Sequence, residues 1–262
     1  MCHGISTGGE HPLTVDRLDA FMRIAADLGF ASVSYDDLAA WRSGERDLPA
    51  RPIMIDFDHP VVSMRYEVKD VLDRYGFRGN LFVQTKPLIE LHAGSVPARE
   101  QRETLTWDEL AELRDAGWNL GAHTVSHPNL SKLSQEDPTG ERLRAELDES
   151  NATIEAHLGF VPRDFAFTGT SWSSLAEQEV EKRYRFGRLW IVGAEYQADG
   201  KPIRYADLVG VPGDDEPDGG PPAAARYITR QSPPYRLPSM ELQRLLYEPA
   251  AFRAYLEASV AV

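Results

Sequence analysis

The strongest constraint on the fold is a regular alternation of short apolar runs with amphipathic segments of helical period. In residues 14–29, for example, Thr14 can cap a helix, apolar residues recur every three or four positions, and Gly29 follows the last turn. Because strands that are separated by helices pair in parallel, the sequence predicts an α/β protein with a mainly parallel sheet or barrel. Further helices are predicted within residues 62–75, 106–118 and 141–159, a strand and a short helix within 31–44, and strands within 52–58, 80–85, 119–128, 164–169 and 188–193.

The length of 262 residues suits one α/β barrel, and we expect a single domain over residues 1–262. Residues 196–236 interrupt the alternation with a segment rich in glycine, proline and aspartate, which indicates a long loop insertion rather than a linker. The insertion follows the last predicted strand, so we expect it at the edge of the sheet where parallel strands end. An insertion there would more naturally cover a pocket than widen a groove, which favours a small substrate over a long polymer.

Composition and charge exclude several classes of protein. The formal net charge of -13 argues against nucleic acid or an anionic membrane as a partner, because binding phosphates requires a concentrated basic surface. No apolar run is long enough to span a membrane, and the first residues lack the basic and apolar regions of a secretory signal. The single cysteine, Cys2, excludes an intrachain disulfide and is expected to be a small buried apolar residue. We therefore expect a cytoplasmic protein with no nucleic-acid or membrane partner, and a homo-oligomer is possible.

Polar side chains cluster after two of the predicted strands. Asp56, Asp58 and His59 end one apolar run, and His123 and His127 follow another. The carboxyl ends of parallel strands lie at one edge of a sheet, so we expect these side chains to share a site. Carboxylates and imidazoles crowded together would be costly to desolvate without a cation. The pattern therefore favours a metal site.

Three motifs in this order resemble the polysaccharide deacetylase family, also called carbohydrate esterase family four. They are IDFDH at residues 55–59, GAHTVSHPNL at 121–130 and FAFTG at 165–169. Residues 11–57 and the segment YRLPSMEL at 235–242 resemble the permuted members that de-N-acetylate poly-N-acetylglucosamine. The resemblance implies a distorted (β/α) barrel of about seven parallel strands.

The resemblance also assigns a base and metal ligands. Asp58 matches the general base, His123 and His127 match two metal ligands, and His59 stands where the family has a metal-binding carboxylate. Three neutral histidines favour zinc as the one divalent metal, with iron, cobalt, nickel or manganese as alternatives. Asp56 is either a carboxylate that orients a ligand, which we favour, or itself the third ligand. The second alternative would also suit iron(II) oxygen chemistry.

A further set of residues is assigned to proton donation and substrate binding. His3 matches the N-terminal histidine that serves as general acid in the permuted members, and its alternative is a disordered terminal residue. The resemblance implies an oxyanion site at the backbone around Thr168 and Gly169. Trp107 and Trp172 could either line the substrate pocket or pack in the core.

These assignments leave three functional hypotheses. The first is a metal-dependent deacetylase or amidohydrolase that cleaves the linear C–N bond of a small N-acyl amine or amino sugar. The second is a non-hydrolytic iron enzyme on the same scaffold, and the third is a catalytically inactive binding homologue. Retention of Asp58, His123, His127 and His3 together favours an active enzyme, and hydrolysis leads because both proton-transfer positions are filled.

Overall fold

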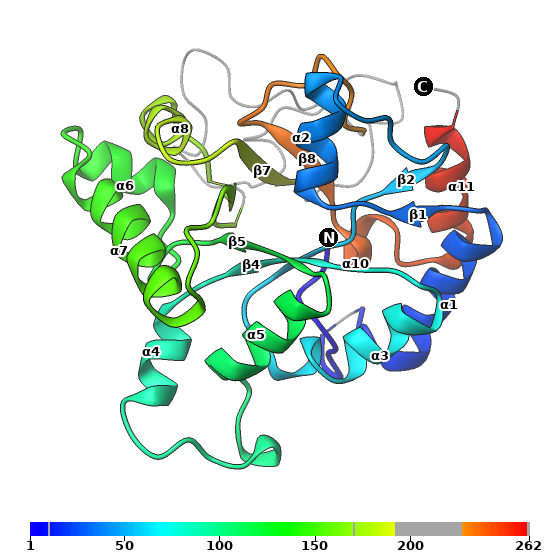
Figure 1. The fold of residues 1–262 in the computed structure, drawn as a ribbon, viewed down its shortest axis with the longest axis horizontal. Coiled ribbons are helices and arrows are strands. Elements are labelled where there is room, and N and C mark those ends of the chain that lie inside the picture. Colours follow the sequence, from blue (N-terminus) through cyan, green and yellow to red (C-terminus); the bar gives the residue numbers. More distant parts are fainter. Residues whose placement is uncertain (10, 170, 192–226, 261–262) are drawn as a thin grey trace. The chain divides into compact units, whose positions relative to one another are not determined.

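The computed structural model describes residues 1–9, 11–169, 171–191 and 227–260 (Figure 1). The chain divides into two compact units, and strands β4 and β5 contribute residues to both of them. The single domain expected over residues 1–262 stays a prediction. The first unit comprises Met1–Phe82, Lys86–Leu120 and Leu246–Val262, and the second comprises Val83–Thr85 and Gly121–Leu245.

The main sheet has six strands within the described ranges, and its spatial order β3-β4-β5-β6-β7-β8 repeats the order along the chain. The strand pairs whose register the structure gives are parallel. A sheet wound in one direction is typical of (β/α) barrels, whereas doubly wound sheets reverse their order at a switch point. The strands are β3 (Asp56–Asp58), β4 (Asn80–Val83), β5 (Asn119–Ala122), β6 (Asp164–Ala166), β7 (Phe186–Ile191) and β8 (Leu237–Met240).

In the first unit, helix α1 (Val15–Asp27) begins where the sequence predicts. The Thr14 side chain accepts a hydrogen bond from the backbone N–H of Arg17, and the apolar face packs against helices α3 and α11. Burial of this face, including Leu18 and Phe21, supplies most of the helix's stability, as for amphipathic helices generally. The other elements are β1 (Ala31–Ser32), α2 (Tyr35–Ser43), β2 (Pro52–Ile53), α3 (Glu67–Arg74), α4 (Lys86–His92), α5 (Trp107–Asp115), α11 (Pro249–Ser259) and two 3-10 turns, η1 (Val62–Met64) and η2 (Arg99–Gln101).

In the second unit, helices α6, α7 and α8 pack against one another. The buried residues of α7 include Leu143, Leu147, Ile154 and Leu158, whose spacing places them along one face of the helix. Helix α7 therefore has a fixed rotation about its axis, which also fixes where its polar residues point. The helices of this unit are α6 (Leu130–Glu136), α7 (Glu141–Leu158), α8 (Ser174–Glu181) and α10 (Leu242–Leu245).

The structure departs from the sequence-based expectations in two places. The helix predicted over residues 62–75 is divided into η1 and α3, because Tyr66 leaves helical geometry while its hydroxyl bonds to Glu109. Strand β8 was not predicted, since Pro238 interrupts its apolar run.

Most of the predicted insertion at 196–236 lies outside the described residues. Whether it covers a pocket therefore stays a prediction. No described helix is both long enough and apolar enough to cross a membrane.

Candidate metal centre

Strand β3 carries two acidic residues that have different surroundings. The Oδ2 atom of Asp56 accepts a hydrogen bond of 3.0 Å from the Tyr35 hydroxyl, and its Oδ1 atom accepts one of 3.1 Å from the Asn80 amide. These bonds engage both oxygens of a carboxylate that is only 3% exposed. The contacts of Asp56 therefore stabilise the fold around β3. Asp58, at the carboxyl end of the strand, is also buried, at 2% exposure.

His59 follows β3 directly and has a left-handed backbone conformation, with φ of 67°. Its N–H donates a hydrogen bond of 3.1 Å to the Phe82 carbonyl of β4. Such a φ is uncommon outside glycine and typically costs about 1–3 kcal/mol, so it persists only where the surrounding structure enforces it. The conformation turns the chain sharply at the end of the strand.

The N-terminal segment pairs with β3. Cys2 forms a parallel bridge with Phe57, through hydrogen bonds of Cys2 N–H to Asp56 O and of Asp58 N–H to Cys2 O. Cys2 is buried, as predicted, and burial raises the pKa of its thiol to about 11. The bridge brings the ring of His3 to 5.4 Å from that of His59 in a stacked arrangement. His3 therefore lies beside the end of β3, and its assignment as the general acid stays a prediction.

His123 is the first residue after β5 and is fully buried. Its N–H donates to the Val83 carbonyl of β4 at 3.1 Å, and its ring Nδ1 lies 2.8 Å from the Ala166 carbonyl oxygen. A carbonyl oxygen only accepts, so Nδ1 carries a proton, and in the neutral ring Nε2 keeps its lone pair. This is the arrangement in which metal-binding histidines are usually held.

The loop after β5 contains two more residues with a left-handed backbone. Thr124 and His127 both have φ of 61°, and with His59 they are the non-glycine residues of positive φ in the described chain. The Thr124 hydroxyl accepts a 3.1 Å hydrogen bond from the His127 N–H. The resulting turn brings the rings of His123 and His127 to a centroid distance of 4.8 Å, edge to face.

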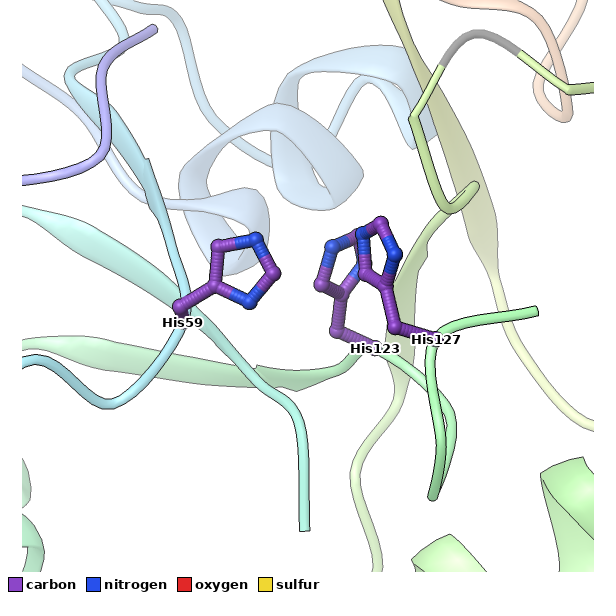
Figure 2. Close-up of side chains that lie close together, drawn as sticks. All are labelled: His59, His123 and His127. Carbon is purple, nitrogen blue, oxygen red and sulfur yellow. The ribbon is translucent and has the colours of Figure 1, made fainter. Parts of the chain in front are cut away.

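Each of His59, His123 and His127 offers one ring nitrogen, and these atoms lie within 4.8 Å of one another. Figure 2 shows His59 facing the other two rings. Two backbone contacts support this proximity, because His59 and His123 are bonded to Phe82 and Val83, which are consecutive in β4. Zinc bonds of about 2.0–2.1 Å would require the nitrogens to close to within about 4.2 Å. The donor set and the protonation of His123 fit a divalent cation.

The residues predicted to bind substrate have mixed surroundings. Gly169 has φ of 57° after β6, and the Thr168 hydroxyl donates to the Pro128 carbonyl. Trp172 is fully buried, and its indole N–H bonds to Glu177 at 2.6 Å. Trp107 is also buried, at 6% exposure. Both tryptophan side chains are thus buried, which agrees with the packing alternative, and their place in the substrate pocket stays a prediction.

Two residues of interest were missed at the level of sequence. Arg188 of β7 is fully buried and lies opposite Ala166, whose carbonyl oxygen holds His123. A guanidinium remains charged when buried, so an arginine that opens an apolar run was a usable signal. Glu146 of α7 accepts hydrogen bonds from the loop between His123 and His127. Nothing in the sequence around Glu146 distinguishes it from the other acidic residues of α7.

Comparison with known proteins places the chain in a family. The polysaccharide deacetylase family matches residues 45–184, more than half of the chain. YxkH of Bacillus subtilis (strain 168), whose name assigns it to the polysaccharide deacetylases, is 21% identical over 141 residues, which is 54% of this chain and 47% of YxkH. The chain thus spans about half the length of this relative.

Two solved structures show the same fold. BC0361, a polysaccharide deacetylase from Bacillus cereus, has a TM-score of 0.66 and 14% identity, over 98% of this chain and 67% of its own. A de-N-acetylase from Aggregatibacter actinomycetemcomitans has a TM-score of 0.59 and 15% identity, over 72% and 84% of the two chains. The predicted class, a distorted (β/α) barrel of parallel strands, is confirmed.

The chain belongs to the polysaccharide deacetylase family, as its motifs predicted.

Proposed function

We propose that the protein is a metal-dependent hydrolase that removes an acyl group, most simply acetyl, from the nitrogen of its substrate. The observation that carries the proposal is the cluster of three histidine nitrogens within 4.8 Å, formed by residues at the ends of β3 and β5. Membership of the polysaccharide deacetylase family supports the reaction class. The similar de-N-acetylase supports an amide rather than an ester as the substrate.

His59, His123 and His127 would hold the cation, with zinc favoured because all three ligands are neutral imidazoles. Bound there, a divalent cation would polarise the acyl oxygen and lower the pKa of a water molecule. The backbone strain at His59 and His127 supports a functional role, since such conformations concentrate at ligand-binding sites.

We assign the proton transfers to Asp58 and His3. Asp58 would accept the proton of the attacking water, and His3 would donate a proton to the amine as the C–N bond breaks. The support for His3 is its ring at 5.4 Å from His59, held by the bridge between Cys2 and Phe57. Backbone N–H groups around Thr168 and Gly169 would stabilise the oxyanion, because both residues lie just beyond the carboxyl end of β6.

The alternative of an iron enzyme that uses Asp56 as a ligand is not supported. The two carboxylate oxygens of Asp56 accept hydrogen bonds from Tyr35 and Asn80, and Asp56 is not part of the described histidine cluster. We therefore propose that Asp56 stabilises strand β3.

Metal analysis of the purified protein, combined with assays for acetate and formate release from N-acyl substrates, tests the proposal. We expect one divalent ion per chain. We also expect release of acetate or formate, which a chelator abolishes and added zinc restores. A protein that binds no divalent metal, or that hydrolyses N-acyl substrates equally well after chelation, would contradict it.

A further inference from the structure

The turn that carries His127 is attached to helix α7 through one side chain. Glu146 accepts hydrogen bonds of 2.9 Å from the backbone N–H groups of Val125 and Ser126, both at Oε2. Its other oxygen, Oε1, accepts a hydrogen bond from the Ser126 hydroxyl. One carboxylate therefore binds Val125 and Ser126, the two residues between Thr124 and His127.

The backbone of this turn requires such an external partner. Thr124 and His127 both have positive φ, and threonine is β-branched, which makes this conformation a clear outlier. Successive N–H groups beside a left-handed residue point to one side and form a concave site for an anion. The Glu146 carboxylate occupies that site, so its hydrogen bonds to the backbone stabilise the strained turn.

Helix α7 holds Glu146 in place. Leu143, Leu147 and Ile154 are buried on one face of the helix, which fixes its rotation. Glu146 itself is half-buried, between the buried face and the solvent-exposed side. Its position is therefore set by the core of the second unit and not by the loop alone.

We propose that Glu146 is the positioning residue of the metal centre, which holds the turn at residues 124–127 so that His127 converges with His123. This inference rests on the proposed function, because it assumes that the histidine cluster binds a metal. Glu146 would not touch the metal or the substrate. Its effect would pass through the backbone of Val125 and Ser126 to the ring of His127.

Two substitutions separate hydrogen bonding from charge. Glu146→Ala removes every acceptor, whereas in Glu146→Gln the amide oxygen can still accept from both backbone N–H groups. The amide nitrogen can donate to the Ser126 hydroxyl, which then acts as the acceptor. Glu149→Ala, which removes an exposed carboxylate one turn further along α7, is the matched control.

The measurements are the zinc dissociation constant by competition with a chromophoric chelator, and the visible spectrum of the cobalt(II)-substituted protein. Loss of a group that orients a metal ligand typically weakens metal binding by about 10- to 100-fold. We expect a loss of that size for Glu146→Ala, with an altered cobalt spectrum, and changes of less than about threefold for the glutamine and Glu149 variants. A purely structural role would lower thermal stability without changing the cobalt spectrum.

The outcomes are distinguishable. If the wild-type protein binds zinc tightly and Glu146→Ala binds it equally well, the positioning role is overturned while the metal centre stands. If Glu146→Gln loses as much affinity as Glu146→Ala, charge and not hydrogen bonding is responsible, and the inference is wrong as stated. If the wild-type protein binds neither zinc nor any other divalent metal, the proposed function itself fails. Should Glu146→Ala not fold, Glu146→Asp replaces it, because the shorter side chain keeps the charge but cannot reach both N–H groups.

Discussion

The two regions that contribute histidines to the cluster hold their strained backbone by different means. At the end of β3, His59 is held by its main-chain bond to Phe82 of β4, and the strand before it is paired with the N-terminal segment through Cys2. In the loop after β5, side chains accept hydrogen bonds from backbone N–H groups. The Thr124 hydroxyl accepts from His127, and Glu146 accepts from Val125 and Ser126.

The difference separates two tasks. The β5 loop supplies two of the three histidines and, in our proposal, serves metal binding alone. The end of β3 supplies one histidine and Asp58, and the N-terminal segment beside it supplies His3; we assign the proton transfers to Asp58 and His3. Substitutions in the loop should therefore remove the metal, whereas substitutions of Asp58 or His3 should remove turnover and leave the metal bound.

The largest effect is expected for His127→Ala, which removes a ligand from the β5 loop. We expect loss of stoichiometric metal and, with it, of all metal-dependent turnover. Metal content by mass spectrometry of the purified variant checks this. The control is His157→Ala, which changes an exposed histidine of α7. A full complement of metal in His127→Ala would refute the division between the two regions.

Asp58→Asn should lower turnover by about 10²- to 10⁴-fold, the usual range for loss of a general base, and should leave the metal content unchanged. The amide has nearly the same volume but cannot accept the proton. The measurement is the rate of acyl release by the metal-loaded variant. Turnover equal to that of the wild type would show that Asp58 is not the base.

His3→Gln should lower turnover of an amide substrate by roughly 10²-fold, with the metal content unchanged. The loss should be much smaller for an activated ester such as p-nitrophenyl acetate, because its leaving group departs without a proton. The measurement is the rate of hydrolysis of the amide and of the ester, each by the His3 and the Asp58 variants. Equal losses on amide and ester would assign His3 a structural role instead of proton donation.

The smallest effect concerns substrate size. From the insertion at 196–236 we predict that a soluble N-acetyl monomer is hydrolysed several-fold faster than a long oligomer, because a covered pocket would admit the smaller molecule. Rates of acetate release from equal concentrations of N-acetyl groups in the two substrates check this. Faster release from the oligomer would indicate an open groove at the end of the sheet.

The sequence predicted those parts of the fold that local patterns determine. The apolar runs that became β4, β5 and β6 and the capped helices α1 and α5 were located because their signals lie within the segment itself. The division of the helix over residues 62–75 depends on Tyr66 reaching Glu109, far along the chain, and no local pattern reports such a contact.

The same distinction applies to the candidate site. The three histidines were identified from motif spacing, and their nitrogens do lie close together. The left-handed backbone at His59 and His127 was not predicted, because these conformations are held by the Phe82 carbonyl and by the Thr124 hydroxyl and Glu146. The resemblance placed His3 at the site, but the bridge between Cys2 and Phe57 that holds it was not predicted, because it joins residues far apart in the sequence.

The positive φ angles at His59, Thr124 and His127 have a consequence for protein engineering. Glycine adopts this conformation without steric cost, so a selection for thermostability alone would favour glycine at these positions. Each replacement would remove a proposed metal ligand or the hydroxyl that accepts a hydrogen bond from the His127 N–H. Libraries designed to stabilise this protein should therefore keep these three positions fixed, because stability and activity are in direct conflict there.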